Sequence, residues 1–214
     1  MNSFGFTEQM FTAIYEQRLW GDQGGETVSG EGSTISYTEH LREELPKLFE
    51  KFSITSVLDA PCGDFNWMRK LMKEHPEIQY TGGDIVRPII EQLQTTDTTN
   101  NQKFIHLDIT LSKLPKTDLM IVRDCLSHLE PQLVANFIRN FANSDIKYLL
   151  AGTWHNNGSW ANVNLNTGGV HPIDLFSEPY NFDTNVLYTI EDWSGDHRPR
   201  KLCMWSLDQI RDLL

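Results

Sequence analysis

Acidic residues stand at the ends of three expected strands, where the carboxyl edge of an open α/β sheet binds ligands. They are Asp59, Asp84 and Asp108, which follow the short segments SVL, YTGG and HL. Buried strands favour Val, Ile and Leu, and an unpaired carboxylate costs several kcal/mol to desolvate. These acids therefore indicate a polar ligand, although each is also compatible with an ordinary turn residue after a strand.

The turn after Asp59 indicates which ligand this is. A carboxylate about 20 residues beyond a glycine turn typically accepts hydrogen bonds from both ribose hydroxyls, and Asp84 lies 25 positions after Asp59. A pyrophosphate needs several glycines, whereas this turn has only Gly63, together with the acids Asp59 and Asp64. The pattern predicts a positively charged nucleoside without phosphate. S-adenosylmethionine, with its sulfonium and ammonium groups, meets both conditions.

A glycine-rich segment, SGEGS at positions 29–33, precedes the first expected strand. Such a composition is typical of a flexible linker. Trp20 stands close to it in the sequence, and an aromatic residue there favours a second interpretation. In that interpretation Trp20, Ser29 and Ser33 form a lid over the ligand and help to anchor its carboxylate.

Three residues after the later strands have the chemistry of a general base. Asp124 ends the fourth expected strand, His128 follows it, and His155 follows the fifth strand. A histidine with a pKa of about 6.5 accepts a proton near neutrality. The alternative for both histidines is a packing or surface role.

The segment from 153 to 169 is rich in amides and hydroxyls. Trp154 ends the fifth expected strand, and Asn162, Asn164 and Thr167 are spaced so that their side chains would project to one face. We expect these four residues to bind a small acceptor molecule. The alternative is a solvated loop with Asn in its turns.

The periodicity of apolar residues predicts the elements that position these groups. Helical spacing predicts helices over 7–18 and 38–51, with Thr38 as the N-cap of the second. After residue 52, β-branched runs alternate with helical ones. The expected strands are 54–59, 78–85, 103–109, 117–124, 146–154 and 201–207, and the expected helices are 65–75, 87–94, 130–142 and a short one at the end of the chain.

This alternation predicts right-handed βαβ crossovers in an α/β fold. We expect a Rossmann-like, doubly wound, mainly parallel seven-stranded sheet with helices on both faces. Residues 1–52 would form an N-terminal helical lid of the same domain, and residues 53–214 the Rossmann-like domain. An acceptor-binding insertion is expected over residues 155–200.

The composition limits the partners. The chain has 214 residues and a formal net charge of −11, which argues against binding to nucleic acid. No targeting segment is visible, and no apolar run approaches the roughly 18 to 20 residues that cross a bilayer, so we expect no membrane partner and a cytoplasmic location. Cys62, Cys125 and Cys203 lack metal-ligand spacing, which predicts neither a disulfide framework nor a metal site.

Several segments resemble the motifs of the class I S-adenosylmethionine-dependent methyltransferases. VLDAPCGDFNW resembles the first motif with a single turn glycine, YTGGDIV the second, HLDIT the third-strand motif and DLMIVRDCLSHL the fourth-strand motif. The flanking segments are similar, more weakly, to a bacterial small-molecule subgroup. Pro61 and Cys62 depart from the usual small residues of the first motif. The resemblance implies a cofactor loop of Asp59, Ala60, Pro61 and Gly63, ribose binding by Asp84 with Ile85, adenine contacts by Asp108 and Ile109, and Arg123 with Asp124 near the methyl group or its acceptor.

These patterns favour a methyltransferase that acts on a hydroxyl or amine of a small polar metabolite, such as a sugar or a natural-product intermediate. One alternative is an NAD-dependent oxidoreductase on the same sheet, which the shortage of glycines disfavours. Another is a non-catalytic nucleoside-binding protein. The sequence leaves the acceptor and the oligomeric state open.

Overall fold

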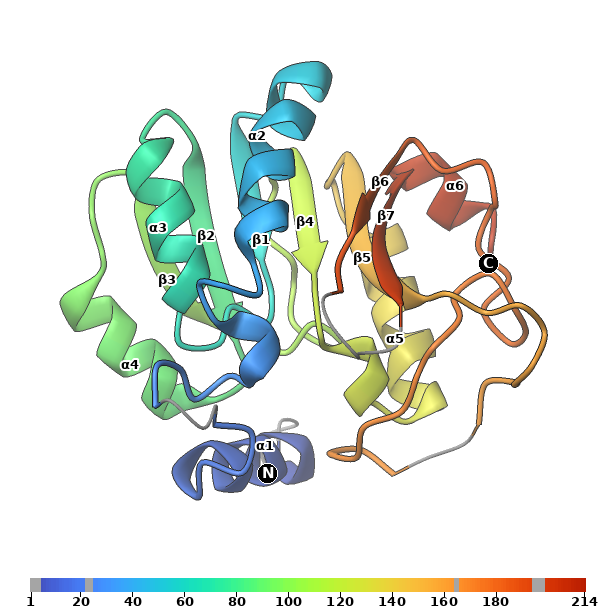
Figure 1. Cartoon of the computed structure of the whole chain (residues 1–214), viewed down its shortest axis with the longest axis horizontal. Coiled ribbons are helices and arrows are strands. Elements are labelled where there is room, and N and C mark those ends of the chain that lie inside the picture. Colours follow the sequence, from blue (N-terminus) through green and yellow to red (C-terminus); the bar gives the residue numbers. More distant parts are fainter. Residues whose placement is uncertain (1–4, 22–24, 164–165, 194–198) are drawn as a thin grey trace. The chain divides into compact units, whose positions relative to one another are not determined.

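The computed structural model describes residues 5–21, 25–163, 166–193 and 199–214. It divides into two compact units, an N-terminal unit, Met1–Asp108, and a C-terminal unit, Ile109–Leu214. Figure 1 shows strands and helices in both units. The sequence-based boundary after residue 52 stays a prediction.

The N-terminal unit contains three parallel strands in the order β3-β2-β1. They are β1 (Ser56–Asp59), β2 (Gln79–Asp84) and β3 (Gln102–His106). Asp59 is paired with Gly82, and Asp84 with His106, so these acids close their strands at the same edge. This is the arrangement that the strand-end acids predict.

The helices of the N-terminal unit follow the apolar periodicity closely. They are α1 (Gly5–Glu16), the short η1 (Glu31–Ser33), α2 (Glu39–Phe52), α3 (Asn66–Glu74) and α4 (Arg87–Thr96). In α2 the buried residues Leu41, Leu45 and Leu48 recur at helical spacing. Thr38 precedes α2 as expected, but its hydroxyl donates to the carbonyl of Thr34 at 2.8 Å instead of capping the helix.

Aromatic packing joins the turn after β1 to the sheet of this unit. The ring of Phe65 lies 4.9 Å from that of Tyr80 and 5.0 Å from that of Phe104, measured between centroids. All three residues are buried. Rings at these separations stabilise a core by their area and by their edge-to-face geometry.

The C-terminal unit contains four strands in the order β4-β5-β7-β6. They are β4 (Leu119–Val122), β5 (Tyr148–Trp154), β6 (Tyr188–Glu191) and β7 (Arg200–Ser206). β4 and β5 are parallel, whereas β7 is antiparallel to both β5 and β6. The helices are the short η2 (Leu126–His128), α5 (Pro131–Ala142) and α6 (Leu207–Arg211).

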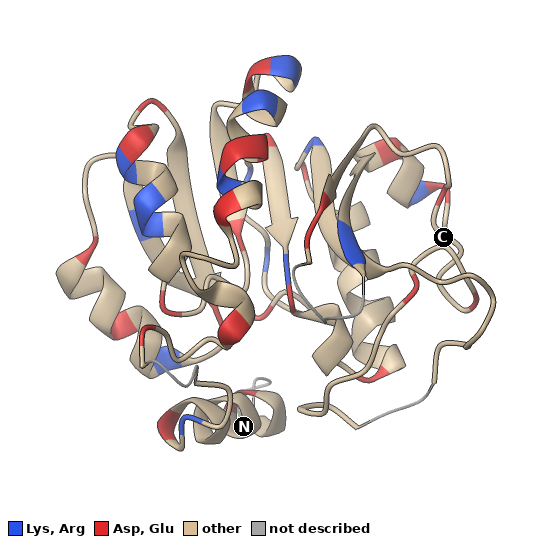
Figure 2. Cartoon of the chain, viewed as in Figure 1, with Lys and Arg blue, Asp and Glu red and all other residues tan. Residues whose placement is uncertain are grey.

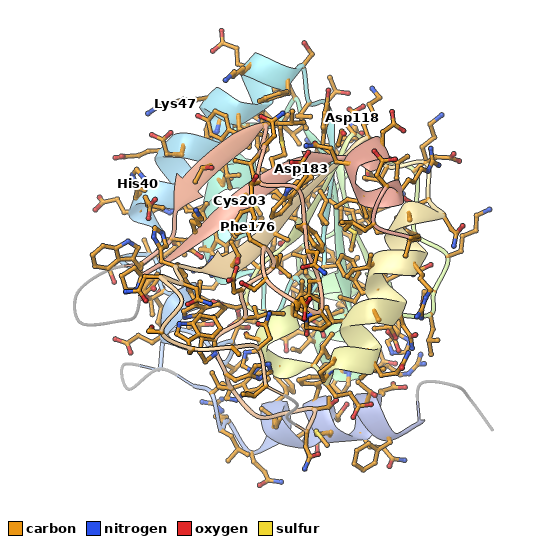
Figure 3. The ribbon with its side chains drawn as sticks, turned by 90° about the vertical axis from the view of Figure 1, so that its right-hand side faces the viewer. His40, Lys47, Asp118, Phe176, Asp183 and Cys203 are labelled. Carbon is orange, nitrogen blue, oxygen red and sulfur yellow. The ribbon has the colours of Figure 1, made fainter. Side chains whose placement is uncertain are left out.

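Strand β6 was not predicted because its sequence lacks the apolar run of a buried strand. Only Ile190 of its four residues is buried. Its neighbour β7 has four buried residues and was expected. Phe176 and Phe182 pack on Trp205 of β7, with ring centroids 5.8 and 4.9 Å away. Figure 3 labels Phe176 and also Cys203, which belongs to the same strand β7.

The prediction of a Rossmann-like, mainly parallel seven-stranded α/β fold with an N-terminal helix is confirmed. Figure 2 shows that most charged residues lie on helices and connections, and that β1 and β2 carry acids only at their ends. Within the described parts of the chain, no helix is both long enough and apolar enough to span a membrane.

Candidate functional site

The turn between β1 and α3 brings backbone amides to the end of β2. The amide of Cys62 donates to the carbonyl of Gly83 at 2.9 Å, and the amide of Gly63 donates to Oδ2 of Asp84 at 3.0 Å. Gly63 has φ +52°, in the left-handed region that favours glycine. The bond between Ala60 and Pro61 is cis. The single glycine of this turn therefore stands where the chain requires it.

Asp84 is held by two amides on its two oxygens. Besides the Gly63 contact, Oδ1 accepts from the amide of Val86 at 2.9 Å. Burial raises the pKa of the Asp84 carboxyl above its usual value, although hydrogen bonds from the amides of Val86, Gly63 and Ile85 act in the opposite direction. A carboxylate offers about four acceptor positions. Because the amide of Ile85 also acts on this carboxyl, the contacts leave acceptor capacity for at least one ligand hydroxyl.

Asp59 has a different environment from the one expected of a cofactor ligand. Its Oδ2 accepts a hydrogen bond of 2.8 Å from the hydroxyl of Tyr80, and both residues are buried. The charge of Asp59 is thus stabilised inside the unit. The cofactor role expected for Asp59 stays a prediction.

The second acid of the turn, Asp64, holds the glycine-rich segment. Its carboxylate accepts hydrogen bonds from Thr27, Val28 and Ser29 at 2.8 to 3.0 Å. A Cβ built on Gly63 would lie 2.3 Å from the hydroxyl oxygen of Ser29. Ser29 therefore lies directly against the turn, and its role in a lid stays a prediction.

The other two residues of the expected lid make contacts within the same segment or with α1. The hydroxyl of Ser33 donates to the carbonyl of Ser29 at 3.3 Å. The ring of Trp20 packs on that of Phe11 in α1, with centroids 5.7 Å apart. Trp20 is half-buried. It links α1 to the chain that leads into the glycine-rich segment.

The residues expected at the adenine lie at the ends of β2 and β3. Ile85 is half-buried, and its carbonyl accepts from Nε2 of His106 at 2.9 Å. Asp108 is buried at the end of the N-terminal unit. Ile109, the first residue of the C-terminal unit, is also buried, and its carbonyl accepts from Nδ2 of Asn140 at 2.7 Å.

In the C-terminal unit, Arg123 forms a buried two-point ion pair with Asp192. Its Nε and Nη2 each donate to one carboxylate oxygen at 2.9 Å. Both side chains are at most 5% exposed. Such a bidentate pair satisfies the geometry of both groups. The cofactor role expected for Arg123 stays a prediction.

Asp124 lies between two arginines. Its Oδ1 accepts from Nη1 of Arg200, and its Oδ2 lies 3.5 Å from Nη1 of Arg123. Partial burial acts to raise the pKa of Asp124, but the positive charges of Arg123 and Arg200 outweigh it and the pKa is lowered. The guanidinium carbon of Arg200 lies 5.6 Å from the centre of the Trp154 ring. A carboxylate with a depressed pKa is a poor proton acceptor, so Asp124 is better suited to positioning than to base catalysis.

His128 keeps the features of a base. Its Nδ1 lies 2.9 Å from the carbonyl of Gly169, which requires the proton on Nδ1 and leaves the lone pair on Nε2. Burial lowers the pKa of His128, although the charge of Asp124 and the contact with Gly169 act to raise it. The imidazole is therefore neutral at pH 7 with a defined tautomer.

Solved structures of methyltransferases have the same fold as this chain. The N-methyltransferase NodS from Bradyrhizobium japonicum, in complex with S-adenosyl-l-homocysteine, is 15% identical, with a TM-score of 0.64 over 90% of this chain and 97% of that one. Magnesium protoporphyrin IX methyltransferase from Synechocystis, with bound SAH, is 13% identical, with a TM-score of 0.61 over 96% and 99% of the two chains. The chain has the class I methyltransferase fold.

Human N-acetylserotonin methyltransferase, solved in complex with SAM, is a third example of this methyltransferase fold. It is 14% identical, with a TM-score of 0.57, over 92% of this chain and 59% of that one. The sequence itself matches no protein-family model, and no curated protein is significantly similar to it. At these identities the likeness establishes the fold alone.

The insertion of the methyltransferase fold after β5 uses most of its expected acceptor residues internally. The amide of Asn162 accepts from the backbone of Asp174 at 2.9 Å and donates to the carbonyls of Asp174 and Glu178 at 2.8 Å each. The hydroxyl of Thr167 accepts from the amide of Glu130 at 3.3 Å. Asn162 thus holds the insertion together, whereas Thr167 joins it to the start of α5. Asn164 lies outside the described residues.

His155 follows β5 at the surface. Its Nε2 lies 3.1 Å from Oε2 of Glu191 in β6, and the imidazole is exposed. An exposed pair of this kind is worth little energy and does not concentrate a base near a buried reaction centre. The pair joins the end of β5 to β6 at the surface, and a catalytic role of His155 stays a prediction.

The sequence contains no indication of residues whose ion-pair partners lie far away along the chain. Asp192 and Arg200 had no local signal, because each pairs with a residue about 70 positions away or more. His171 was also missed. It is 5% exposed, and its Nδ1 has no hydrogen-bond partner among the described residues. Nor do the described residues contain a group of three His, Cys, Asp or Glu that could hold a metal ion.

Proposed function

We propose that this chain is an S-adenosylmethionine-dependent methyltransferase that acts on a hydroxyl or amine of a small polar metabolite. The observation that carries the proposal is the arrangement of Gly63 and Asp84. A buried carboxylate at the end of β2, with acceptor capacity left over, lies against the only glycine of the turn after β1. This is the arrangement that a ribose needs, and the methyltransferase fold supports it.

The N-terminal unit would hold the cofactor. Asp84 would accept hydrogen bonds from the two ribose hydroxyls, because its oxygens are oriented by Gly63 and Val86. Gly63 would allow the amino acid part of the cofactor to approach the backbone. Further residues of this unit with proposed cofactor contacts are Ile85 and Asp108 at the adenine, and Asp59, Ala60, Pro61, Trp20, Ser29 and Ser33 around the turn. Two residues of the C-terminal unit, Ile109 and Arg123, also keep a proposed cofactor role.

The bound cofactor would supply an electrophilic methyl group. Transfer to an aligned nucleophile needs little covalent help from the protein, so most of the rate would come from proximity and orientation. For a hydroxyl acceptor, His128 would take the proton at Nε2, since Gly169 holds the proton on Nδ1. Asp124 and Arg200 would position this region, because each already neutralises the other.

The acceptor would be small and polar. Trp154 offers a flat ring under the guanidinium of Arg200, and both lie at the ends of strands in the C-terminal unit. The charges around them are balanced, since Arg123 and Arg200 face Asp124 and Asp192. A balanced set of charges favours an uncharged acceptor, which agrees with a sugar or a similar hydroxyl-rich compound.

Calorimetry with S-adenosylmethionine, S-adenosylhomocysteine and NAD would test the cofactor. We expect both sulfur nucleosides to bind and NAD not to bind. The matched variants are Asp84→Asn, which should lose binding, and Asp145→Asn, an exposed control in which binding should be unchanged. Binding of NAD alone would overturn the proposal in favour of an oxidoreductase.

A panel of acceptors with release of S-adenosylhomocysteine as the readout would test the reaction. We expect turnover on sugars or polar hydroxyl compounds. Turnover on peptides alone would contradict the proposed acceptor class. Binding without turnover across a broad panel would favour a non-catalytic nucleoside-binding protein.

A further inference from the structure

Three donors from one short segment converge on the carboxylate of Asp64. Oδ2 accepts from the hydroxyl of Thr27 at 2.8 Å and from the amide of Val28 at 2.9 Å, and Oδ1 accepts from the hydroxyl of Ser29 at 3.0 Å. The amide of Asp64 donates back to the same Ser29 oxygen at 3.0 Å. Asp64 and residues 27–29 thus form a closed set of four hydrogen bonds across more than 30 positions of sequence.

A second contact fastens the same segment to the start of α3. Nδ2 of Asn66 donates to Oε1 of Glu26 at 2.6 Å and to the carbonyl of Ser33 at 3.0 Å. The same Glu26 oxygen accepts from the amide of Ile35 at 2.7 Å. We call residues 26–35 the strap. Both of its attachments come from residues 64–66, directly after Gly63.

The chemistry of the first attachment favours a carboxylate. Oδ2 accepts from a hydroxyl and an amide and Oδ1 from a hydroxyl, so an ionised carboxylate satisfies all three donors, and hydrogen bonds to an ionised acceptor are roughly twice as strong as neutral ones. An asparagine would place an NH₂ group against a donor at one of the two ends. The charge of Asp64 also acts on Tyr15 of α1. The pKa of Tyr15 is raised, mainly by burial and to a smaller extent by Asp64.

The strap lies at the point where a cofactor would approach the backbone. The hydroxyl oxygen of Ser29 is only 2.3 Å from the place of a Cβ on Gly63. The amide of Gly63, in turn, holds Asp84. A change in the position of Ser29 would therefore shift the Gly63 turn, which orients the proposed ribose carboxylate of Asp84.

We propose that Asp64 is a positioning residue that fastens the strap over the Gly63 turn and thereby controls how fast the cofactor leaves. This inference rests on the proposed function for the identity of the ligand. Asp64 does not contact the cofactor in this scheme, because its oxygens are used by Thr27, Val28 and Ser29. The cofactor departs when these hydrogen bonds open.

The test compares Asp64→Asn with Asp145→Asn, an exposed aspartate in the C-terminal unit. Stopped-flow measurement with S-adenosylhomocysteine should show dissociation at least tenfold faster in Asp64→Asn, with a smaller change in the association rate. Hydrogen exchange of the amides of Val28, Ser29 and Asp64 should also become faster. The Asp145→Asn protein should match the wild type in both measurements.

Two further variants remove the donors instead of the acceptor, so that a folding defect of Asp64→Asn does not stop the test. Thr27→Val and Ser29→Ala should each speed dissociation, and each combined with Asp64→Asn should add less than it does alone. Unchanged dissociation in all three single variants would overturn the inference. Failure of the wild type to bind S-adenosylhomocysteine would instead contradict the proposed function, and hydrogen exchange would still decide whether Asp64 holds the strap.

Discussion

The amide nitrogen of Gly63 lies 3.0 Å from Oδ2 of Asp84, and this hydrogen bond joins the turn after β1 to the end of β2. Gly63 has φ +52°, a left-handed backbone conformation that favours glycine. Ser29 closes the space on the side of the missing Cβ.

Replacing Gly63 by Ala should remove cofactor binding. A left-handed conformation costs an alanine about 1–2 kcal/mol, and the new Cβ would also meet the Ser29 hydroxyl. The matched control is Gly25→Ala, where φ is +72° but no atom lies within 4 Å of the Cβ position. Chemical denaturation should show a larger loss for Gly63→Ala than for Gly25→Ala, and calorimetry should show binding only in the control. Equal losses in the two variants would argue against the steric role of Ser29.

Cofactor affinity should fall on acidification at a higher pH than an ordinary aspartate would cause. Burial raises the pKa of Asp84, so the carboxyl takes up its proton above the usual value of about 3.9 and loses an acceptor position for ribose. The sign for stability is opposite. The folded state binds this proton more tightly than the unfolded state, so ionised Asp84 destabilises the protein at neutral pH, and this penalty disappears as the pH falls.

Calorimetry with S-adenosylhomocysteine between pH 7.5 and pH 4 would check the effect on affinity. Asp145→Asn should follow the wild-type curve, since Asp145 is exposed and remote in sequence from the turn. An affinity that stays constant down to the range of a free aspartate would contradict the role of Asp84.

The variant His128→Gln should lower kcat for a hydroxyl acceptor by about 10²–10⁴-fold, the usual contribution of a general base. Because burial lowers the pKa of His128, the acidic limb of the pH–rate profile should lie below pH 6.5 in the wild type and vanish in the variant. His155→Gln, at the surface, is the control and should keep both rate and profile. Unchanged S-adenosylhomocysteine binding in His128→Gln would separate chemistry from folding.

The same shift predicts a stability effect. Burial lowers the pKa values of both His128 and His171 in the folded state, so the unfolded state binds more protons as the pH falls through the unfolded value of about 6.5. The free energy of unfolding should therefore be complete above that pH and decline below it. Denaturation at pH 7.5 and pH 5.5 should show a smaller decline in the double variant with both histidines replaced by Gln.

Replacing Asp192 by Ala should cost about 3–5 kcal/mol of stability, since it leaves the guanidinium of Arg123 buried without its two-point partner. The control is Glu44→Ala, which removes an i,i+3 pair with Lys47, whose side chain is 63% exposed. Such exposed pairs contribute about 0–1 kcal/mol. Urea unfolding of both variants measures the difference. Similar losses of unfolding free energy would show that the buried Arg123–Asp192 pair contributes no more than an exposed pair.

The order of strands and helices could be predicted from the sequence because its signals are local. Apolar spacing placed α2 and α5 within a residue or two of their observed ends, and buried runs placed β1, β2, β4 and β5. β6 was not found, because a half-exposed edge strand with one buried residue has little pattern to detect.

The acids at the strand ends were also visible in the sequence, since parallel strands place their carboxyl ends at one edge. What each acid does was decided only by the tertiary structure. Asp59 accepts from Tyr80 across 21 positions and Arg123 is bound by Asp192 across 69, whereas Asp84 keeps acceptor capacity. A carboxylate or guanidinium binds whichever complementary group folding brings within about 3 Å, and no local pattern encodes that partner. The sequence therefore determined which residues had the right chemistry, and the tertiary structure decided which of them were already occupied.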